Sequence, residues 1–267
     1  MDSSASILYG LIQGITEFLP VSSSGHLALL PRFLTIKDPG VLFDLAMHVG
    51  TAFSIIIYFH KEVNSIFRSL FGIIKEPASY KTQGAWVSNM IVATGVTFGF
   101  VLLLKPFAEQ YARNPLWIIV NLTAFGLLML VADLKGPKQA QPVMKELRLA
   151  KAALIGFGQA LAIFPGVSRS GATLTVARFL NLSRDEATRF SFLLSLPIIL
   201  AGFFYKLPTL LEEGSQFDWS ACFIGMIVSF VVGLVTIHFF LKVIKRLGLW
   251  LFSLYRLVLS FIILFYL

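Results

Sequence analysis

Residues 10–34 read GLIQGITEFLPVSSSGHLALLPRFL, and residues 156–180 read GFGQALAIFPGVSRSGATLTVARFL. Each stretch has an apolar arm, a break at Pro or Gly, a cluster of small hydroxyl residues and a second apolar arm. Neither arm has the roughly 20 apolar residues that a membrane-spanning helix needs. The sequence therefore predicts two re-entrant helical hairpins, which enter a membrane and return to the same side. A loosely packed full-length span is the alternative.

The composition places these stretches in a membrane protein. The chain has 267 residues, 57% of them hydrophobic and 13% charged, and its mean hydropathy is +0.80. A soluble domain of this size needs more polar residues to cover its surface. The basic residues behind the net charge of +8 lie between hydrophobic runs, so we assign them to loops and expect no nucleic-acid partner. The single cysteine excludes an intramolecular disulfide and a cysteine-based metal cluster.

Six further apolar runs are long enough to cross a membrane, and three of them follow each broken stretch. They are 41–59, 86–104, 116–132, 189–207, 219–241 and 249–267. The predicted fold class is an all-α polytopic membrane protein with six transmembrane helices plus two re-entrant helical hairpins. Residues 1–267 form a single integral membrane domain with two repeat halves, 6–133 and 152–267. Each half has three spans, which is an odd number, so the second half enters the membrane from the opposite side. This arrangement is an inverted-topology repeat.

The two broken stretches align when the sequence is shifted by 146 residues, from Gly10 to Gly156. Polar, small and aromatic residues coincide in this register. The aligned pairs include Gln13 with Gln159, Phe18 with Phe164, Ser22 with Ser168, Ser24 with Ser170, Gly25 with Gly171, and Arg32, Phe33 and Leu34 with Arg178, Phe179 and Leu180. The alignment supports the repeat, and it places the special site near the membrane midplane, where the broken elements meet.

Loop charges predict the orientation. Under this topology one side receives the loops 60–85, 133–151, 178–189 and 242–248, with fifteen Lys and Arg. The other side receives both termini and the loops 32–40, 105–115 and 206–218, with five. Basic loops favour the cytoplasmic side. We therefore expect both termini to lie outside.

The first break carries polar and charged residues, which are unfavourable inside a membrane. A charged side chain at the bilayer centre costs about 2.5–3.5 kcal/mol, so each one needs a partner or a function. Gln13 and Glu17 are one helical turn apart and share a helix face. If the second arm starts among the serines, Ser23 and His26 at i, i+3 can meet.

The three serines at the break have two interpretations. They can be helix caps and close-packing residues, as small polar residues often are in membranes. They can also be part of a site. The structural interpretation fits Ser22 and Ser24 better than Ser23.

The second break supplies an arginine, Arg169, among small and hydroxyl residues, namely Ser168, Ser170, Gly171 and Thr173. In the repeat register Arg169 falls opposite Ser23. Two helix N-termini would then converge, and their dipoles and unpaired N–H groups make an anion site. A guanidinium nearby can bind phosphate through two hydrogen bonds. With a carboxylate, a hydroxyl and an imidazole, these are the parts of a phosphoryl-transfer site.

The same charged residues also have structural interpretations. Glu17 and Arg169 can be a buried ion pair that joins the hairpins. His26 can bind only a backbone carbonyl. Asp44 and His48, one turn apart in the first span, either line the same cavity or pair with each other.

The motifs GITEFLPVSSSGH and FPGVSRSGATLT resemble those of the bacterial undecaprenyl-diphosphate phosphatases, the family linked to bacitracin resistance. The similarity covers essentially the whole chain, including FSFLLSLP and the terminal YRLVLS. The family's first motif is Glu or Gln, three residues, then Glu, which here is Gln13 and Glu17. Its second motif, Pro-Gly-x-Ser-Arg-Ser-Gly, matches residues 165–171 without departure.

The resemblance implies a phosphatase with a lipid substrate. The family hydrolyses undecaprenyl diphosphate to undecaprenyl phosphate and inorganic phosphate at the outer face of the inner membrane, which recycles the lipid carrier for cell-wall synthesis. It implies an active site open to the periplasm and a divalent cation, Ca²⁺ or Mg²⁺, that supports activity. Membrane lipids are the expected surroundings, and a homodimer is left open.

The resemblance also implies roles for single residues. Glu17 would be the essential carboxylate, as metal ligand or acid/base, Ser23 the candidate nucleophile, His26 its proton partner, and Arg169 the phosphate clamp. Gln13 would join Glu17 as a metal ligand, but its amide removes one carboxylate and weakens models with two acidic ligands. The residues around the diphosphate would be Gln13, Ser22, Ser24, Ser168, Ser170, Gly171 and Thr173. Either Ser23 or an activated water attacks the terminal phosphorus.

Two other functions were weighed against this one. A lipid-carrier transporter or flippase also uses inverted repeats with broken helices, so the fold alone does not decide between them. Acid-phosphatase-like lipid phosphatases carry a PSGH motif close to SSSGH. They also need a Lys-x6-Arg-Pro run upstream and a histidine soon after the Ser-Arg pair. Neither is present, since the first histidine after Arg169 is His238, so we reject that family.

Overall fold

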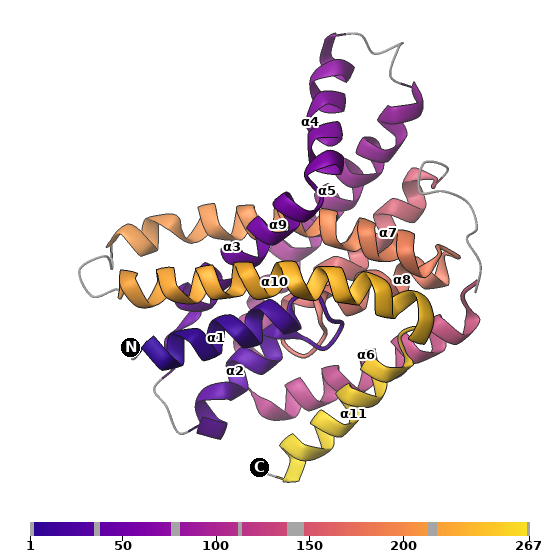
Figure 1. Ribbon diagram of the computed structural model, residues 1–267. Helices are drawn as coiled ribbons and strands as arrows, with labels where there is room; N and C mark the ends of the chain where they lie inside the picture. Colours follow the sequence, from indigo (N-terminus) through magenta and orange to yellow (C-terminus); the bar gives the residue numbers. More distant parts are fainter. Residues whose placement is uncertain are drawn as a thin grey trace.

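The broken stretches of the sequence are broken helices in the computed structural model, which describes residues 3–34, 38–75, 81–111, 114–137, 147–212 and 218–265 (Figure 1). Every regular element in these residues is a helix. The first break separates α1 (Ser3–Thr16) from α2 (Ser23–Leu34). The second separates α7 (Leu149–Ala160) and a short 3₁₀ turn, η2 (Leu161–Ile163), from α8 (Arg169–Phe179). Both predicted interruptions are therefore confirmed.

The two breaks share a positive φ at aligned serines. Ser22 has φ 75° and Ser168 has φ 69°, a positive φ that costs a residue with a side chain about 1–3 kcal/mol. Each serine offsets this cost as a helix cap. Ser22 Oγ accepts from the N–H of Gly25 at 3.3 Å, and Ser168 Oγ accepts from the N–H of Gly171 at 3.2 Å.

Each of the six predicted spans corresponds to one long helix. These helices are α3 (Val41–Tyr58), α5 (Lys81–Tyr111), α6 (Pro115–Lys135), α9 (Arg184–Glu212), α10 (Trp219–Leu247) and α11 (Trp250–Phe265). Four of them, α5, α6, α9 and α10, are long and apolar enough to cross a membrane. A fifth span arises if α3 is joined to α4 (His60–Lys75), which follows it at an angle of 86°. These helices indicate a multi-pass membrane protein.

In its described residues the structure has four or five candidate spans where the sequence predicts six, and the two helices that account for the difference are α3 and α11. Helix α3 ends beside Phe59, where the chain turns into α4. Helix α11 has 16 described residues, and Leu249, whose N–H donates to a carboxylate oxygen of Asp133 at 2.9 Å, precedes its first turn. The last two residues of the predicted run lie outside the described residues. The arrangement of six spans with two re-entrant hairpins stays a prediction.

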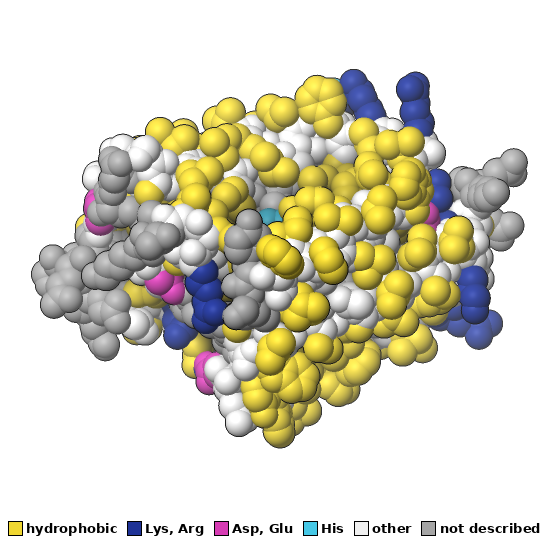
Figure 2. Space-filling model, turned by 90° about the horizontal axis from the view of Figure 1, so that it is seen from below, with side chains coloured by type: hydrophobic (Ala, Val, Ile, Leu, Met, Phe, Trp, Pro, Cys, Tyr) yellow, Lys and Arg dark blue, Asp and Glu magenta, His cyan; other side chains and the backbone are white. Residues whose placement is uncertain are grey.

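Large apolar side chains cover the outside of the helices. Leu102, Leu103 and Phe261 are 69%, 67% and 70% exposed, which suits a surface in contact with lipid. On the face in Figure 2, hydrophobic side chains cover most of the middle, and charged side chains gather toward its ends.

The first arms of the two broken stretches pack at aligned glycines. Helix α1 lies along α10, and α7 packs against α5 (Figure 1). A methyl group at Gly10 would lie 2.5 Å from the carbonyl oxygen of Gly225, and one at Gly156 would lie 2.2 Å from that of Ala93. Both glycines therefore let two backbones approach closely, as small residues do between membrane helices.

Candidate functional site: a polar cavity between two broken helices

The two breaks lie against each other. Ser22 Oγ accepts from the backbone N–H of Gly166 at 3.1 Å. In return, Ser170 Oγ donates to the carbonyl oxygen of Leu19 at 3.1 Å. Two segments far apart in the sequence are thus joined by hydrogen bonds across their turns.

A buried arginine of α11 holds this junction together. Arg256 has no exposed surface, and its guanidinium donates to five backbone carbonyls at 2.7–3.4 Å. These carbonyls belong to both breaks and to α6, namely Pro20, Gly166, Val167, Asn121 and Leu122. Carbonyl dipoles therefore stabilise the charge, and the backbone of the two turns is fixed around it.

A cavity of about 420 Å³ opens beside the junction. The first residues of α2 and α8, Ser23 and Arg169, line it from aligned positions of the two stretches. Its other polar side chains come from both breaks and from α3, α5 and α7, namely Glu17, Ser24, Asp44, His48, Thr97, Gln159 and Ser168. Two helix N-termini therefore converge on one cavity, as predicted, and their dipoles favour an anion there.

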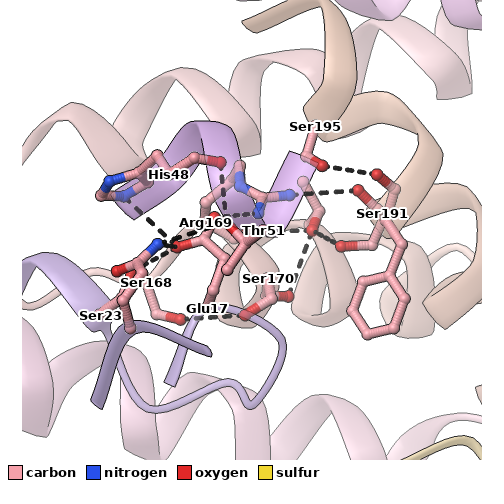
Figure 3. Close-up of polar contacts among 12 residues, drawn as sticks. Glu17, Ser23, His48, Thr51, Ser168, Arg169, Ser170, Ser191 and Ser195 are labelled. Atoms are coloured by element: carbon pink, nitrogen blue, oxygen red, sulfur yellow. Dashed lines mark hydrogen bonds and ion pairs between the residues drawn. The ribbon is translucent and has the colours of Figure 1, made fainter. Parts of the chain in front are cut away.

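Glu17 is the centre of the polar contacts (Figure 3). Its side chain is 3% exposed. Ser23 Oγ donates to Glu17 Oε2 at 2.6 Å, and Gln13 Nε2 donates to the same oxygen at 2.9 Å. The other oxygen, Oε1, accepts from the guanidinium of Arg169, and His48 Nε2 lies 3.4 Å from Oε2. A hydroxyl, an amide, an imidazole and a guanidinium therefore surround one carboxylate.

Arg169 and Glu17 form the ion pair that the sequence left open as a structural alternative. The Arg169 side chain is 13% exposed, and its Nη1 also donates to the carbonyl of Ser191 at 3.4 Å. Both members of the pair line the cavity, so the pair joins the hairpins and also faces the space where a ligand would bind. The two interpretations are compatible.

His48, for which the sequence predicts no catalytic role, lies beside Glu17. The two alternatives for Asp44 and His48 were that they line one cavity or that they pair. Both residues line the cavity, and His48 Nδ1 also lies 2.7 Å from the backbone carbonyl of Asp44, so each alternative applies in part. A carbonyl only accepts, so Nδ1 carries the proton. Nε2, which faces Glu17, is therefore the nitrogen that can exchange a proton with the site.

His26 lies elsewhere. Its Nδ1 is 2.8 Å from the carbonyl of Ser22, its Nε2 is 2.7 Å from the hydroxyl of Tyr255, and its ring stacks on that tyrosine. The side chain does not line the cavity. Because the Ser23 hydroxyl is bound to Glu17, the structure does not pair it with His26 in the way the resemblance implies.

The remaining predicted residues divide into two groups. Ser24 and Ser168 line the cavity. The others support the wall from behind, namely Gln13, Ser22, Ser170, Gly171 and Thr173. Thr173 Oγ1 lies 2.6 Å from Ser191 Oγ, and a methyl group at Gly171 would lie 2.9 Å from Arg256 Nη1.

Gln159 and Thr97 also line the cavity, although neither is among the site residues predicted from the sequence. Gln159 Nε2 donates to Thr97 Oγ1 at 3.2 Å, just as Gln13 Nε2 lies 3.5 Å from Thr51 Oγ1. The signal for Gln159 was present, since it aligns with Gln13. The threonines had no local signal, because the contact joins different helices.

The donor set does not fit a cation held jointly by Gln13 and Glu17. Both oxygens of Glu17 already accept from neighbours, and Gln13 turns its amide nitrogen toward Glu17 from behind the cavity wall. Gln13 Oε1 is buried without a hydrogen-bond partner, as is Gln159 Oε1, and such oxygens favour a cation. In the described part of the chain no three His, Cys, Asp or Glu residues are grouped to hold a metal ion. We therefore derive no step through a metal.

The fold and the site together define a multi-pass helical membrane protein with a buried, anion-attracting cavity between two interrupted helices. Residues 6–262 match the model of the family described as bacitracin resistance protein BacA, and the chain belongs to this family. Membership confirms the resemblance seen in the motifs. It implies undecaprenyl-diphosphate phosphatase activity and a part in bacitracin resistance.

Proposed function

We propose that this protein hydrolyses undecaprenyl diphosphate to undecaprenyl phosphate and inorganic phosphate at the outer face of the inner membrane. The observation that carries the proposal is the contact of Ser23 and Arg169 with the two oxygens of Glu17, on the wall of one cavity. A nucleophile, a base and an anion-binding group are the parts that phosphoryl transfer needs.

The proposal includes six spans and two re-entrant hairpins arranged as an inverted repeat. The matched serines at the breaks, Ser22 and Ser168, support it, and so do the matched glycines, Gly10 and Gly156. The distribution of Lys and Arg over the loops supports an outward opening of the cavity, with both termini outside.

The chemistry begins with the diphosphate at the helix N-termini, where Arg169 binds its oxygens. Ser23 Oγ attacks the terminal phosphorus, and its proton passes to Glu17, the group it already faces. The bond from that phosphorus to the bridging oxygen breaks, and undecaprenyl phosphate leaves. Water then attacks the phosphoserine, releasing inorganic phosphate and restoring the Ser23 hydroxyl. Direct attack by a water bound to Glu17 is the alternative for the first step.

In this proposal a divalent cation is bound to the diphosphate of the substrate and arrives with it. Mg²⁺ commonly binds enzymes through substrate phosphates and only one or two carboxylates. Treatment with EDTA followed by titration of Mg²⁺ or Ca²⁺ tests this. Full activity after EDTA treatment would remove the cation from the proposal.

Phosphate release by the purified protein in detergent tests the function. Wild-type protein should release phosphate from undecaprenyl diphosphate, and Glu17→Ala and Arg169→Ala should not, with folding checked by thermal unfolding. If both variants fold and turn over like wild type, the site is wrong. If wild-type protein releases no phosphate but moves the lipid between leaflets of a vesicle, the protein is a transporter.

The attacking oxygen needs a separate experiment. Acid quenching during turnover, followed by mass spectrometry of the peptide that contains Ser23, should detect a phosphoserine. Ser23→Ala should then abolish release. A Ser23→Ala variant that is only slowed, with no phosphopeptide in wild type, would assign the attack to water.

A further inference from the structure

A second cavity, of about 240 Å³, lies between α3, α9 and α10. Its wall is almost wholly apolar, with residues such as Leu42, Leu45, Phe203, Leu207, Phe223 and Met226. The one charged residue on the wall is Lys206. A lysine covers such a groove with its methylene stem while its amine turns to a polar medium. The groove therefore suits a hydrocarbon ligand.

This apolar groove adjoins the polar cavity. Leu45 lines both. On α9, Gly202 lines the polar cavity and its neighbour Phe203 lines the groove. A methyl group placed at Gly202 would lie 3.7 Å from Leu45 Cδ1, so α3 and α9 meet here with no side chain on the α9 side. Gly202 and Leu45 thus mark the boundary between the two spaces, which we call the threshold.

We propose that this groove binds the first isoprene units of the lipid substrate, and that Gly202 keeps the way open between prenyl chain and diphosphate. The proposal rests on the proposed function. A polyprenyl diphosphate joins a strong anion to a hydrocarbon chain, and the two adjoining cavities match these two parts in order. The prenyl chain would leave the polar cavity past Gly202 and continue into the apolar groove.

The groove would position the substrate more than it would raise affinity. A prenyl chain in the bilayer is already in hydrocarbon, so transfer to an apolar groove gains little free energy. Holding the first units in one place fixes the direction of the attached phosphates relative to Ser23. A blocked threshold should therefore reduce kcat/KM for the lipid substrate.

The chain offers a matched pair of variants for this test. Gly202→Leu places a side chain in the threshold, whereas Gly99→Leu makes the same change on α5, where a Cβ meets no heavy atom of the described residues within 4 Å. We expect kcat/KM for undecaprenyl diphosphate to fall at least about tenfold in Gly202→Leu and less than about twofold in Gly99→Leu. Equal values for the two variants would overturn the proposal.

Cys222 provides a second measurement that does not depend on turnover or on a substitution. It is the single cysteine of the chain and it lines the groove. We expect geranylgeranyl methylene-diphosphonate to slow alkylation of Cys222 by N-ethylmaleimide, and methylene-diphosphonate without a chain to leave it unchanged. Equal alkylation rates with the two compounds would overturn the proposal.

The two failures are distinguishable. If the wild-type protein releases no phosphate from the lipid, the proposed function fails, whatever happens at Cys222. If it releases phosphate but Cys222 reacts equally with both diphosphonates, the function stands and the groove is occupied by ordinary membrane lipid.

Discussion

Ser23 and Arg169 bind the same carboxylate, one on each oxygen of Glu17. The two residues are aligned positions of the two broken stretches, and each is the first residue of its helix. Glu17 belongs to the first stretch only, because the aligned residue of the second stretch is Ile163. The site is therefore asymmetric although Ser23 and Arg169 occupy aligned positions. A single carboxylate thus holds the proposed nucleophile and the anion-binding group in one place.

Replacement of Glu17 by glutamine should abolish most of the activity. The amide keeps the size of the side chain but does not take the proton of Ser23, so we expect kcat to fall by about 10²–10⁴. Phosphate release from undecaprenyl diphosphate measures it. Glu109→Gln makes the same change at a side chain that is 65% exposed and should leave kcat unchanged. Comparable losses in both variants would contradict the role of Glu17.

The ion pair can be tested apart from catalysis with a double variant. Arg169→Met removes the guanidinium from the buried Glu17 carboxylate, to which Ser23 and Gln13 still donate, and we expect a loss of up to about 3–5 kcal/mol in unfolding free energy. Glu17→Met/Arg169→Met removes both charges and should recover much of that stability, but without activity. If the double variant were as active as wild type, the pair would have a structural role only. Thermal unfolding in detergent and phosphate release are the two measurements.

Replacement of His48 should affect turnover more than replacement of His26. His48 Nε2 faces Glu17 across 3.4 Å, whereas both nitrogens of His26 are engaged by Ser22 and Tyr255. Removal of a proton acceptor typically costs about 10²-fold or more, so we expect that loss in kcat for His48→Gln and a smaller one for His26→Gln. The opposite order would support a proton-transfer role for His26, as the resemblance implies.

Much of the site could be predicted because its signals are local. The breaks follow from Pro, Gly and clustered serines, and Glu17, Ser23 and Arg169 are polar residues in apolar stretches. The position of His48 depends on how α3 packs beside the first break, which no local pattern encodes. The predicted run ends at Phe59, where the chain turns, but the angle of 86° to α4 is not encoded in the run itself.

The role of Arg256 also needed the structure. In the sequence it is one arginine in an apolar run, and its five carbonyl partners come from three separate segments. Contacts between segments so far apart produce no regular spacing in the sequence from which they could be predicted. The match of Gly10 with Gly156, in contrast, could be read from the sequence, and both glycines lie where two helix backbones approach closely.

Arg256→Lys should weaken the junction between the two breaks. Lysine keeps the charge but has three donors where the guanidinium makes five hydrogen bonds, so at least two buried carbonyls lose a partner. At about 1.5–3 kcal/mol for each lost hydrogen bond to a charged group, we expect unfolding to be easier by at least about 2 kcal/mol. Because Gly166 and Val167 precede Ser168 and Arg169, we also expect kcat to fall more than KM rises. Arg189→Lys, at a side chain that is 42% exposed, is the matched control. Wild-type stability and kcat in Arg256→Lys would show that the two turns stay together without the guanidinium.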